Sequence, residues 1–193
     1  MANKGLLYGG TRQMKMLKKL LAVVLTGAMA LTLLTACGGN AVRDKDIADA
    51  LNDIVKSSVA VGKHENYTFK PGTDEQAMAK AIAALPEKDW NITGGRNNKF
   101  SGPVMKILKL DEGGANKTSR FVWCGAVVAD EIGAPGQAYH AMNEFLGKDA
   151  ANADNLKDKK PADIRHIGTA LGTLTIHGKQ TTVRFIVVTA EVK

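Results

Sequence analysis

The stretch "RHIGTALGTLTIHGKQTTVRFIVVTAEV", Arg165 to Val192, contains two runs that alternate between apolar and polar residues. The short segment "HGKQ" separates the two runs and contains a glycine. Alternation with a period of two is typical of β-strands, and a brief glycine-containing break between two such runs is typical of a hairpin. The sequence therefore predicts that the chain ends in an antiparallel hairpin, with His177 in its solvated turn.

Upstream of this hairpin, apolar spacing and helix-boundary residues predict four helices. Their expected positions are 44–63 with Asp44 as cap, 73–86 with Thr73 as cap, a short helix opened by Pro103, and 135–147 stopped by Gly147. Pro71 and Gly72 indicate a turn before the second helix. Helices combined with a terminal hairpin indicate an α+β fold.

Two further segments have less specific patterns. The run "RFVWCGAVVADEIG", residues 120–133, is the most apolar part of the interior sequence, and it fits either a buried strand or a buried helix. The run "DAANADNLKDKKPAD", residues 149–163, is charged and lacks apolar periodicity, so it predicts a long surface loop.

The positive charge of the chain is concentrated at its N-terminus. The 193 residues carry a formal net charge of +7, but the first 36 contain five basic residues and no acidic one. Without that segment, 21 basic residues face 19 acidic ones, a net charge of about +2. We therefore expect no nucleic-acid partner, because the domain lacks the strong basic bias such partners require.

The N-terminal segment, residues 1–36, has the pattern of an export signal. A basic stretch, "KMLKK", precedes 15 apolar residues from Leu20 to Leu34, and small residues follow. This apolar run is shorter than the roughly 20 residues of a membrane-spanning helix. Met14 or Met16 would give a more ordinary start than Met1.

The tetrapeptide "LTAC", Leu34 to Cys37, resembles the lipobox of bacterial lipoproteins. The resemblance implies that Cys37 is joined to diacylglycerol and becomes the first residue after cleavage. Two acyl chains on one residue give stable membrane anchoring. We therefore expect a bacterial protein with a lipidated tether, residues 37–46, that holds a single domain, residues 47–193, on the extracytoplasmic face of the membrane.

The mature chain would then contain one free thiol, Cys124, and no intrachain disulfide. Beside Trp123, the simplest interpretation of Cys124 is a small core residue.

The order of the predicted elements resembles that of the CAP superfamily, the α-β-α sandwich of cysteine-rich secretory and pathogenesis-related proteins. Three segments carry the resemblance: "CGAVVADEIGAPGQAYHAMNEFL" (Cys124 to Leu146), "ADIRHIGTALG" (Ala162 to Gly172) and "FSGPVMKILK" (Phe100 to Lys109). It implies a three-layer α-β-α sandwich that ends in the β-hairpin and spans nearly the whole mature domain.

The family's cleft is associated with two histidines and two glutamates that sometimes hold a divalent metal. Carried over residue by residue, only His166 matches; Ala126 stands where one glutamate would be, and Glu144 is displaced by one position. The resemblance therefore implies a CAP-like domain that has lost its metal site. We expect no metal or other cofactor.

The candidate site is accordingly a cleft formed by His166, Glu144 and His140. His140 and Glu144 are four residues apart on one predicted helix, a spacing that permits a shared face. We expect this cleft to bind an unidentified protein or small molecule without catalysis. Two alternatives remain open: a metal-assisted hydrolase that uses the cleft around His166, and a plain adhesion module or spacer.

Overall fold

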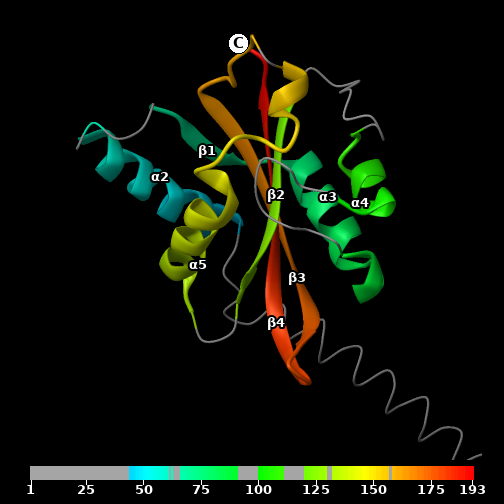
Figure 1. Ribbon diagram of the computed structural model, residues 1–193. Coiled ribbons are helices and arrows are strands. Elements are labelled where there is room, and N and C mark those ends of the chain that lie inside the picture. The colour runs from blue at the N-terminus through cyan, green and yellow to red at the C-terminus, as the bar shows by residue number, and fades with distance from the viewer. Residues whose placement is uncertain are drawn as a thin grey trace, which may run out of the picture. The chain divides into compact units, whose positions relative to one another are not determined.

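The predicted hairpin forms the centre of the β-sheet in the computed structural model (Figure 1). Strand β3 (Ile164–Ile176) pairs antiparallel with β4 (Lys179–Glu191), in a register that runs from His166 opposite Thr189 to Ile176 opposite Lys179. His177 and Gly178 form the turn and have φ values of 49° and 77°. Positive φ at both central residues is the signature of a type I′ turn, whose twist matches that of the flanking strands.

The structure describes residues 44–60, 62, 66–90, 100–110, 120–129, 132–156 and 158–193. The predicted export signal and Cys37 lie outside these described residues. Before the hairpin the elements are α2 (Asp44–Ala60), β1 (Thr68–Pro71), α3 (Thr73–Ala83), the 3-10 turn η1 (Glu87–Asp89), α4 (Gly102–Ile107), β2 (Arg120–Val128), α5 (Ala134–Ala141), the π-turn η2 (Met142–Leu146) and the 3-10 turn η3 (Ala153–Leu156). The fold is α+β.

The four strands form one mixed sheet in the order β1-β3-β4-β2. The first strand, β1, is parallel to β3, whereas β2 is antiparallel to β4 along its whole length. The hairpin therefore occupies the two central positions, and β1 and β2 form the edges.

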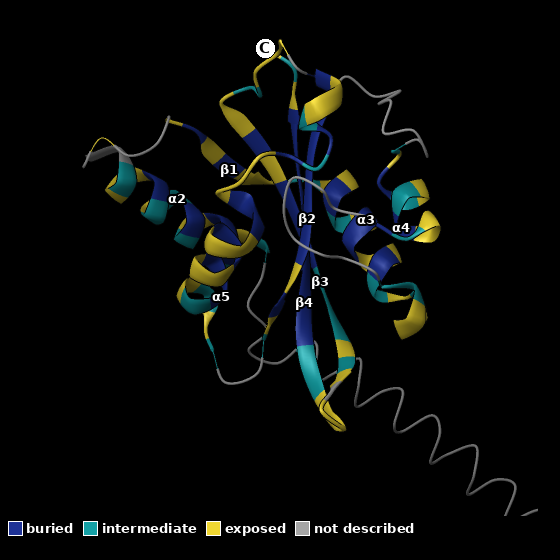
Figure 2. Cartoon of the chain, in the orientation of Figure 1, coloured by how far each residue is buried: buried dark blue, intermediate teal, exposed yellow. Residues whose placement is uncertain are grey.

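Helices cover both faces of this sheet (Figure 1). On one face α2, α5 and η2 pack against side chains such as Phe69, Trp123 and Ile186. On the other face α3 and α4 pack against side chains such as Val122 and Phe185. Figure 2 shows the buried residues along the middle of the hairpin and exposed residues at its tip. The strands β2, β3 and β4 thus send alternate side chains into two separate cores, whereas β1 contributes Phe69 to one of them.

Residues 120–128, for which the sequence left strand and helix open, form the strand β2. Its side chains are buried on both faces, which explains why the segment is continuously apolar and not alternating. Cys124 lies in the α3/α4 core as a free, buried thiol, as predicted, and burial raises the pKa of this thiol to about 12.

Two glycines allow helical segments to approach the sheet closely. A Cβ atom at Gly125 would lie 2.3 Å from the Phe145 ring, so the π-turn packs directly on β2. A Cβ atom at Gly168 would lie 1.9 Å from the backbone nitrogen of Gln76, so the first turn of α3 packs directly on β3. A side chain at either position would force the helical segment away from the sheet.

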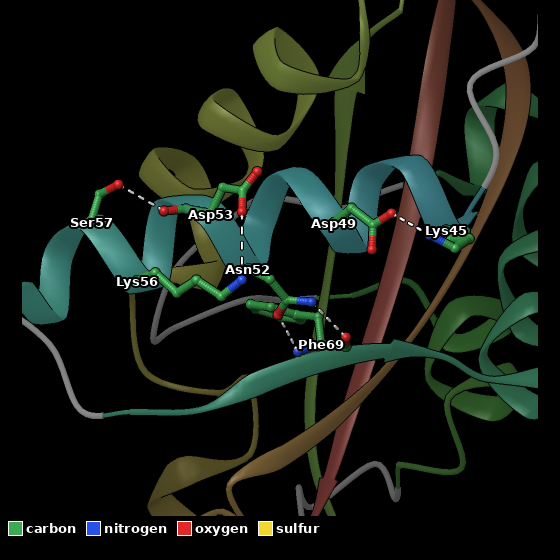
Figure 3. A network of polar contacts seen from close by, with 7 residues as sticks. All are labelled: Lys45, Asp49, Asn52, Asp53, Lys56, Ser57 and Phe69. Carbon is green, nitrogen blue, oxygen red and sulfur yellow. Dashed lines mark hydrogen bonds and ion pairs between the residues drawn. The ribbon is translucent and has the colours of Figure 1, made fainter.

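Asparagine side chains bind backbone groups at both edges of the sheet. At the β1 edge, Asn52 of α2 donates to the Phe69 carbonyl and accepts from the Phe69 N–H, at 3.0 and 2.7 Å (Figure 3). At the β2 edge, Asn152 accepts from the Val122 N–H and donates to the Arg120 carbonyl, at 3.1 and 2.8 Å. These contacts satisfy polar groups that an open edge would leave for another chain.

Neither of the two residues predicted to cap a helix, Asp44 and Thr73, stands at the N-cap position in the structure. Gly72, and not Thr73, is the N-cap of α3, because the helix begins one residue earlier than expected. Asp44 is the first residue of α2, and its carboxylate accepts hydrogen bonds from the N–H and hydroxyl of Thr169 and from the Gln76 side chain. Asp44 therefore fastens α2 to the sheet and to α3.

The segment 149–163 is more than a surface loop. Ala150, Asn152 and Leu156 are buried, and η3 lies within the segment. The exposed lysines and aspartates of this segment account for its polar composition, which predicted a surface loop.

Candidate functional site

The structure does not bring together the three residues of the predicted cleft. His166 is exposed on β3, and a Cβ atom at Gly72 would lie 2.9 Å from the Cβ of His166, so His166 lies on the face that α3 covers. His140 and Glu144 lie on α5 and η2, which pack on the opposite face. The sheet separates them from His166, and the prediction of one shared cleft was wrong.

The His140 and Glu144 pair is also affected by the π-turn. Residues 142–146 bond with an i to i+5 pattern, so side chains four apart no longer lie directly above one another. Both residues are exposed, and among the described residues no hydrogen bond or ion pair joins them. The His140 ring instead contacts Tyr139 edge to face, with ring centres 6.1 Å apart.

The described residues contain neither a metal-binding cluster nor a candidate membrane-spanning helix. No group of three or more histidine, cysteine, aspartate or glutamate side chains in this part of the chain is arranged to hold a metal ion. In the same part of the chain, no helix combines the length and the apolar character that crossing a membrane requires.

A cavity of about 580 Å³ lies at the end of the sheet where β2 and β3 begin. We call it the Arg165 cavity. Its walls combine aromatic, aliphatic and charged side chains, namely Phe121, Trp123, Lys148, Asp149, Ala150, Ala153, Asp154, Leu156, Lys159, Pro161 and Arg165. Small-molecule sites in proteins have volumes of roughly 300–1,000 Å³, so this cavity has the size of a ligand site.

Arg165 is the buried charge of this cavity, with only 7% of its surface exposed. The central carbon of its guanidinium lies 3.4 Å from the Tyr67 ring centre and 4.7 Å from the Trp123 ring centre. Aromatic faces stabilise a desolvated cation and fix the plane of the guanidinium. The aromatic rings lie against the face of the guanidinium. Its N–H donors point along the plane of the guanidinium, which is the direction from which a carboxylate is recognised.

Strand alternation determines which face Arg165 occupies. Arg165 and Ile167 are two residues apart on β3, and Ile167 lies in the core that α2 and α5 cover. Phe121 and Trp123 are likewise two apart on β2 and contribute to the same core, with their rings stacked at 6.1 Å and 28°. The aromatic wall and the arginine therefore share one face of the sheet.

The outer wall is segment 148–159, which backbone and side-chain hydrogen bonds hold against β2. The indole N–H of Trp123 donates to the Lys148 carbonyl at 3.0 Å, and the Ala151 N–H donates to the Val122 carbonyl at 2.8 Å. Asn152 adds its two bonds to β2. Two walls of the cavity, the strand β2 and the segment bonded to it, are therefore held in fixed positions relative to each other.

The rim of the cavity carries both signs of charge. Lys148, Asp149, Asp154 and Lys159 all line the cavity and are all exposed. Together with Arg165, they place three cationic and two anionic side chains around the space. The cavity can therefore hold a ligand by a buried cation at the floor, aromatic and aliphatic contacts in the middle and charged groups at the entrance.

Sequence reasoning missed this site because it selected His166 and passed over its neighbour. The available signal was the spacing of the aromatic residues: "YTF" at 67–69 and "FVW" at 121–123 each place two rings on one face of a strand. Arg165 shares the face of Ile167, but nothing in the sequence specifies that β1 and β2 bring their rings to that face.

No family model, curated protein sequence or solved structure matches this chain.

Proposed function

We propose that the protein is a bacterial lipoprotein, anchored through diacylglyceryl-Cys37 on the extracytoplasmic face, whose domain binds a small anionic ligand in the Arg165 cavity. The observation that carries the binding proposal is the buried Arg165 guanidinium, stacked on Tyr67 and lining a cavity of about 580 Å³. The anchoring part rests on the lipobox-like "LTAC" sequence that ends at Cys37.

We include in this proposal that the domain is a divergent CAP-like sandwich. Helices on both faces of a mixed sheet, together with a terminal hairpin, support this assignment. So does the order of the helices and strands along the chain. The proposed ligand site, however, is the Arg165 cavity and not the cleft associated with that family.

A binding role agrees with the chemistry of the cavity floor. Arginine keeps its proton at all physiological pH values, so it can donate hydrogen bonds and hold an anion but cannot act as a general base. The competing hydrolase hypothesis required His166 and Glu144 in one cleft, and these residues lie on opposite faces of the sheet.

The test compares an anion with its neutral analogue. Calorimetric titration of the full-length chain in lipid nanodiscs should show binding of 3-phenylpropionate and at least about tenfold weaker binding of 3-phenylpropanol, which lacks the charge. Arg165→Lys should weaken 3-phenylpropionate binding by a similar factor, because lysine keeps the charge but loses the planar fork.

Arg120→Lys is the matched control. Arg120 is half-buried on β2, pairs with Glu191 and does not line the cavity, so its replacement should leave the affinity unchanged. Equal binding of the acid and the alcohol, or equal affinities of the Arg165→Lys and Arg120→Lys variants, would refute the proposal.

A further inference from the structure

The charges of the Arg165 cavity are separated by depth. Arg165 is buried at the floor, whereas Asp149 and Asp154 are exposed at the rim. Lys148 and Lys159 also line the rim, so the entrance carries two positive and two negative side chains. The excess charge of the cavity is therefore that of Arg165, which suits a ligand with one carboxylate better than a ligand of high negative charge, such as a phosphate ester.

The middle of the cavity is apolar. The stacked rings of Phe121 and Trp123 form one wall, and Leu156 and Pro161 contribute to the lining. Aromatic surfaces of this kind contribute to binding through apolar burial and offset stacking. The part of the ligand between its charged ends is therefore hydrophobic.

We infer that the ligand is a short peptide that ends in an apolar residue, a zwitterion whose ammonium group and carboxylate lie on different residues. Its carboxylate would bind Arg165, its side chain would pack on Phe121 and Trp123, and its ammonium group would lie near Asp149 or Asp154. The inference rests on the proposed function, because it names the ligand class of the same cavity. In a free α-amino acid both charged groups are bonded to one carbon atom, so they cannot lie on opposite sides of an apolar middle.

The experiment uses probes that differ by one charged group. Leucyl-phenylalanine carries its two charges on different residues, and phenylalanine carries both on one carbon atom. 3-Phenylpropionate lacks the ammonium group, phenethylamine lacks the carboxylate, and inorganic phosphate represents a simple anion. Calorimetric titration of the full-length chain in nanodiscs should show that leucyl-phenylalanine binds at least about tenfold more tightly than phenylalanine, than either single-charge analogue and than phosphate.

Variants locate the ammonium contact. The double variant Asp149→Asn, Asp154→Asn should remove the preference for the zwitterion and leave the affinity for 3-phenylpropionate within about twofold, since only one end of the ligand is affected. Asp158→Asn is the matched control, because Asp158 is exposed on the same segment but does not line the cavity.

These measurements distinguish a failure of the ligand-class inference from a failure of the anion-binding proposal. If 3-phenylpropionate or phenylalanine binds as tightly as leucyl-phenylalanine through Arg165, the peptide inference is overturned and the anion-binding function stands. The inference is also overturned if phosphate binds best, or if the zwitterion preference survives the double aspartate variant. If none of the probes binds, both proposals fail.

Discussion

The guanidinium of Arg165 lies 3.4 Å from the centre of the Tyr67 ring, in a part of the molecule that is almost completely buried. Arg165 lies on β3, and Tyr67 immediately precedes β1. The strand β1 pairs in parallel with β3. This contact joins the edge of the sheet to its centre and sets the orientation of the only arginine that lines the cavity among the described residues.

Replacing Tyr67 with leucine should weaken both the fold and the site. The variant loses a desolvated cation–π contact of about 2 kcal/mol and part of an aromatic core, so we expect the free energy of unfolding to fall by roughly 2–4 kcal/mol. Tyr67→Phe keeps the ring and loses only the weak hydroxyl contact with the Met142 sulfur at 3.9 Å, so it should lose less than about 1 kcal/mol. Urea unfolding followed by circular dichroism measures both, and equal stability of the two variants would contradict the contact's role.

Asn152 should be essential for holding the outer wall of the cavity. It is only 2% exposed and satisfies two backbone groups at the β2 edge, so Asn152→Ala leaves a buried N–H and a buried carbonyl without partners. We expect a loss of roughly 2–4 kcal/mol and faster amide exchange at Ala151. The nearby, exposed Asn155→Ala should change stability by no more than about 0.5 kcal/mol. Similar melting temperatures for these two variants would show that the edge contact is not needed.

The central hairpin was the most predictable part of the fold. Two alternating runs around a histidine–glycine turn specify strands, turn and pairing locally, and the structure has the same boundaries within a residue or two. The start of the short helix at Pro103 was equally local, because proline has a fixed φ that suits the first turn of a helix. Gly147 follows the last helical residue as predicted, and a Cβ atom there would lie 2.7 Å from the Met142 carbonyl oxygen.

The parts that could not be predicted depend on tertiary contacts. The π-turn at Met142–Leu146 lies where the Phe145 ring packs directly on Gly125, 20 residues earlier in the chain. The parallel pairing of β1 with β3 joins segments almost 100 residues apart. Arg165 lies beside Tyr67 and Trp123 only because β1 pairs with β3 and because β2 and β3 both pair with β4. Local sequence patterns therefore did not indicate its role.

Burial of Cys124 should make the fold less stable in alkali. The unfolded thiol titrates near 9.0 and desolvation raises the pKa of the folded thiol to about 12, so the folded state holds its proton more tightly. The resulting stability is fully present below pH 9 and is lost as the pH rises toward 12, by roughly 1 kcal/mol per pH unit.

Cys124→Ala removes this titration and provides the comparison. Urea unfolding of the two proteins at pH 8, 9.5 and 10.5 should show a stability difference that shifts against the wild type as the pH rises. Parallel pH dependences would mean that the thiol ionises without cost in the folded protein.

Membrane attachment is predicted to depend on one sulfur atom. Cys37→Ala should release the protein from the membrane fraction or leave an unprocessed precursor, because no acyl chains can be added. Cys124→Ala is the matched cysteine control and should remain in the membrane fraction. Normal processing together with unchanged membrane retention of Cys37→Ala would refute the anchoring proposal.

The most direct test of the Arg165 cavity uses Trp123 as a reporter inside the site. Trp90 packs on Phe185 in the other core, so Trp90→Phe leaves Trp123 as the only tryptophan, with its ring 4.7 Å from the guanidinium of Arg165. Titration of this variant with 3-phenylpropionate should give a saturable change in tryptophan emission, and adding Arg165→Lys should raise the ligand concentration at the midpoint by at least about tenfold. An unchanged Trp123 signal at saturating ligand, or a midpoint that Arg165→Lys does not move, would contradict the account.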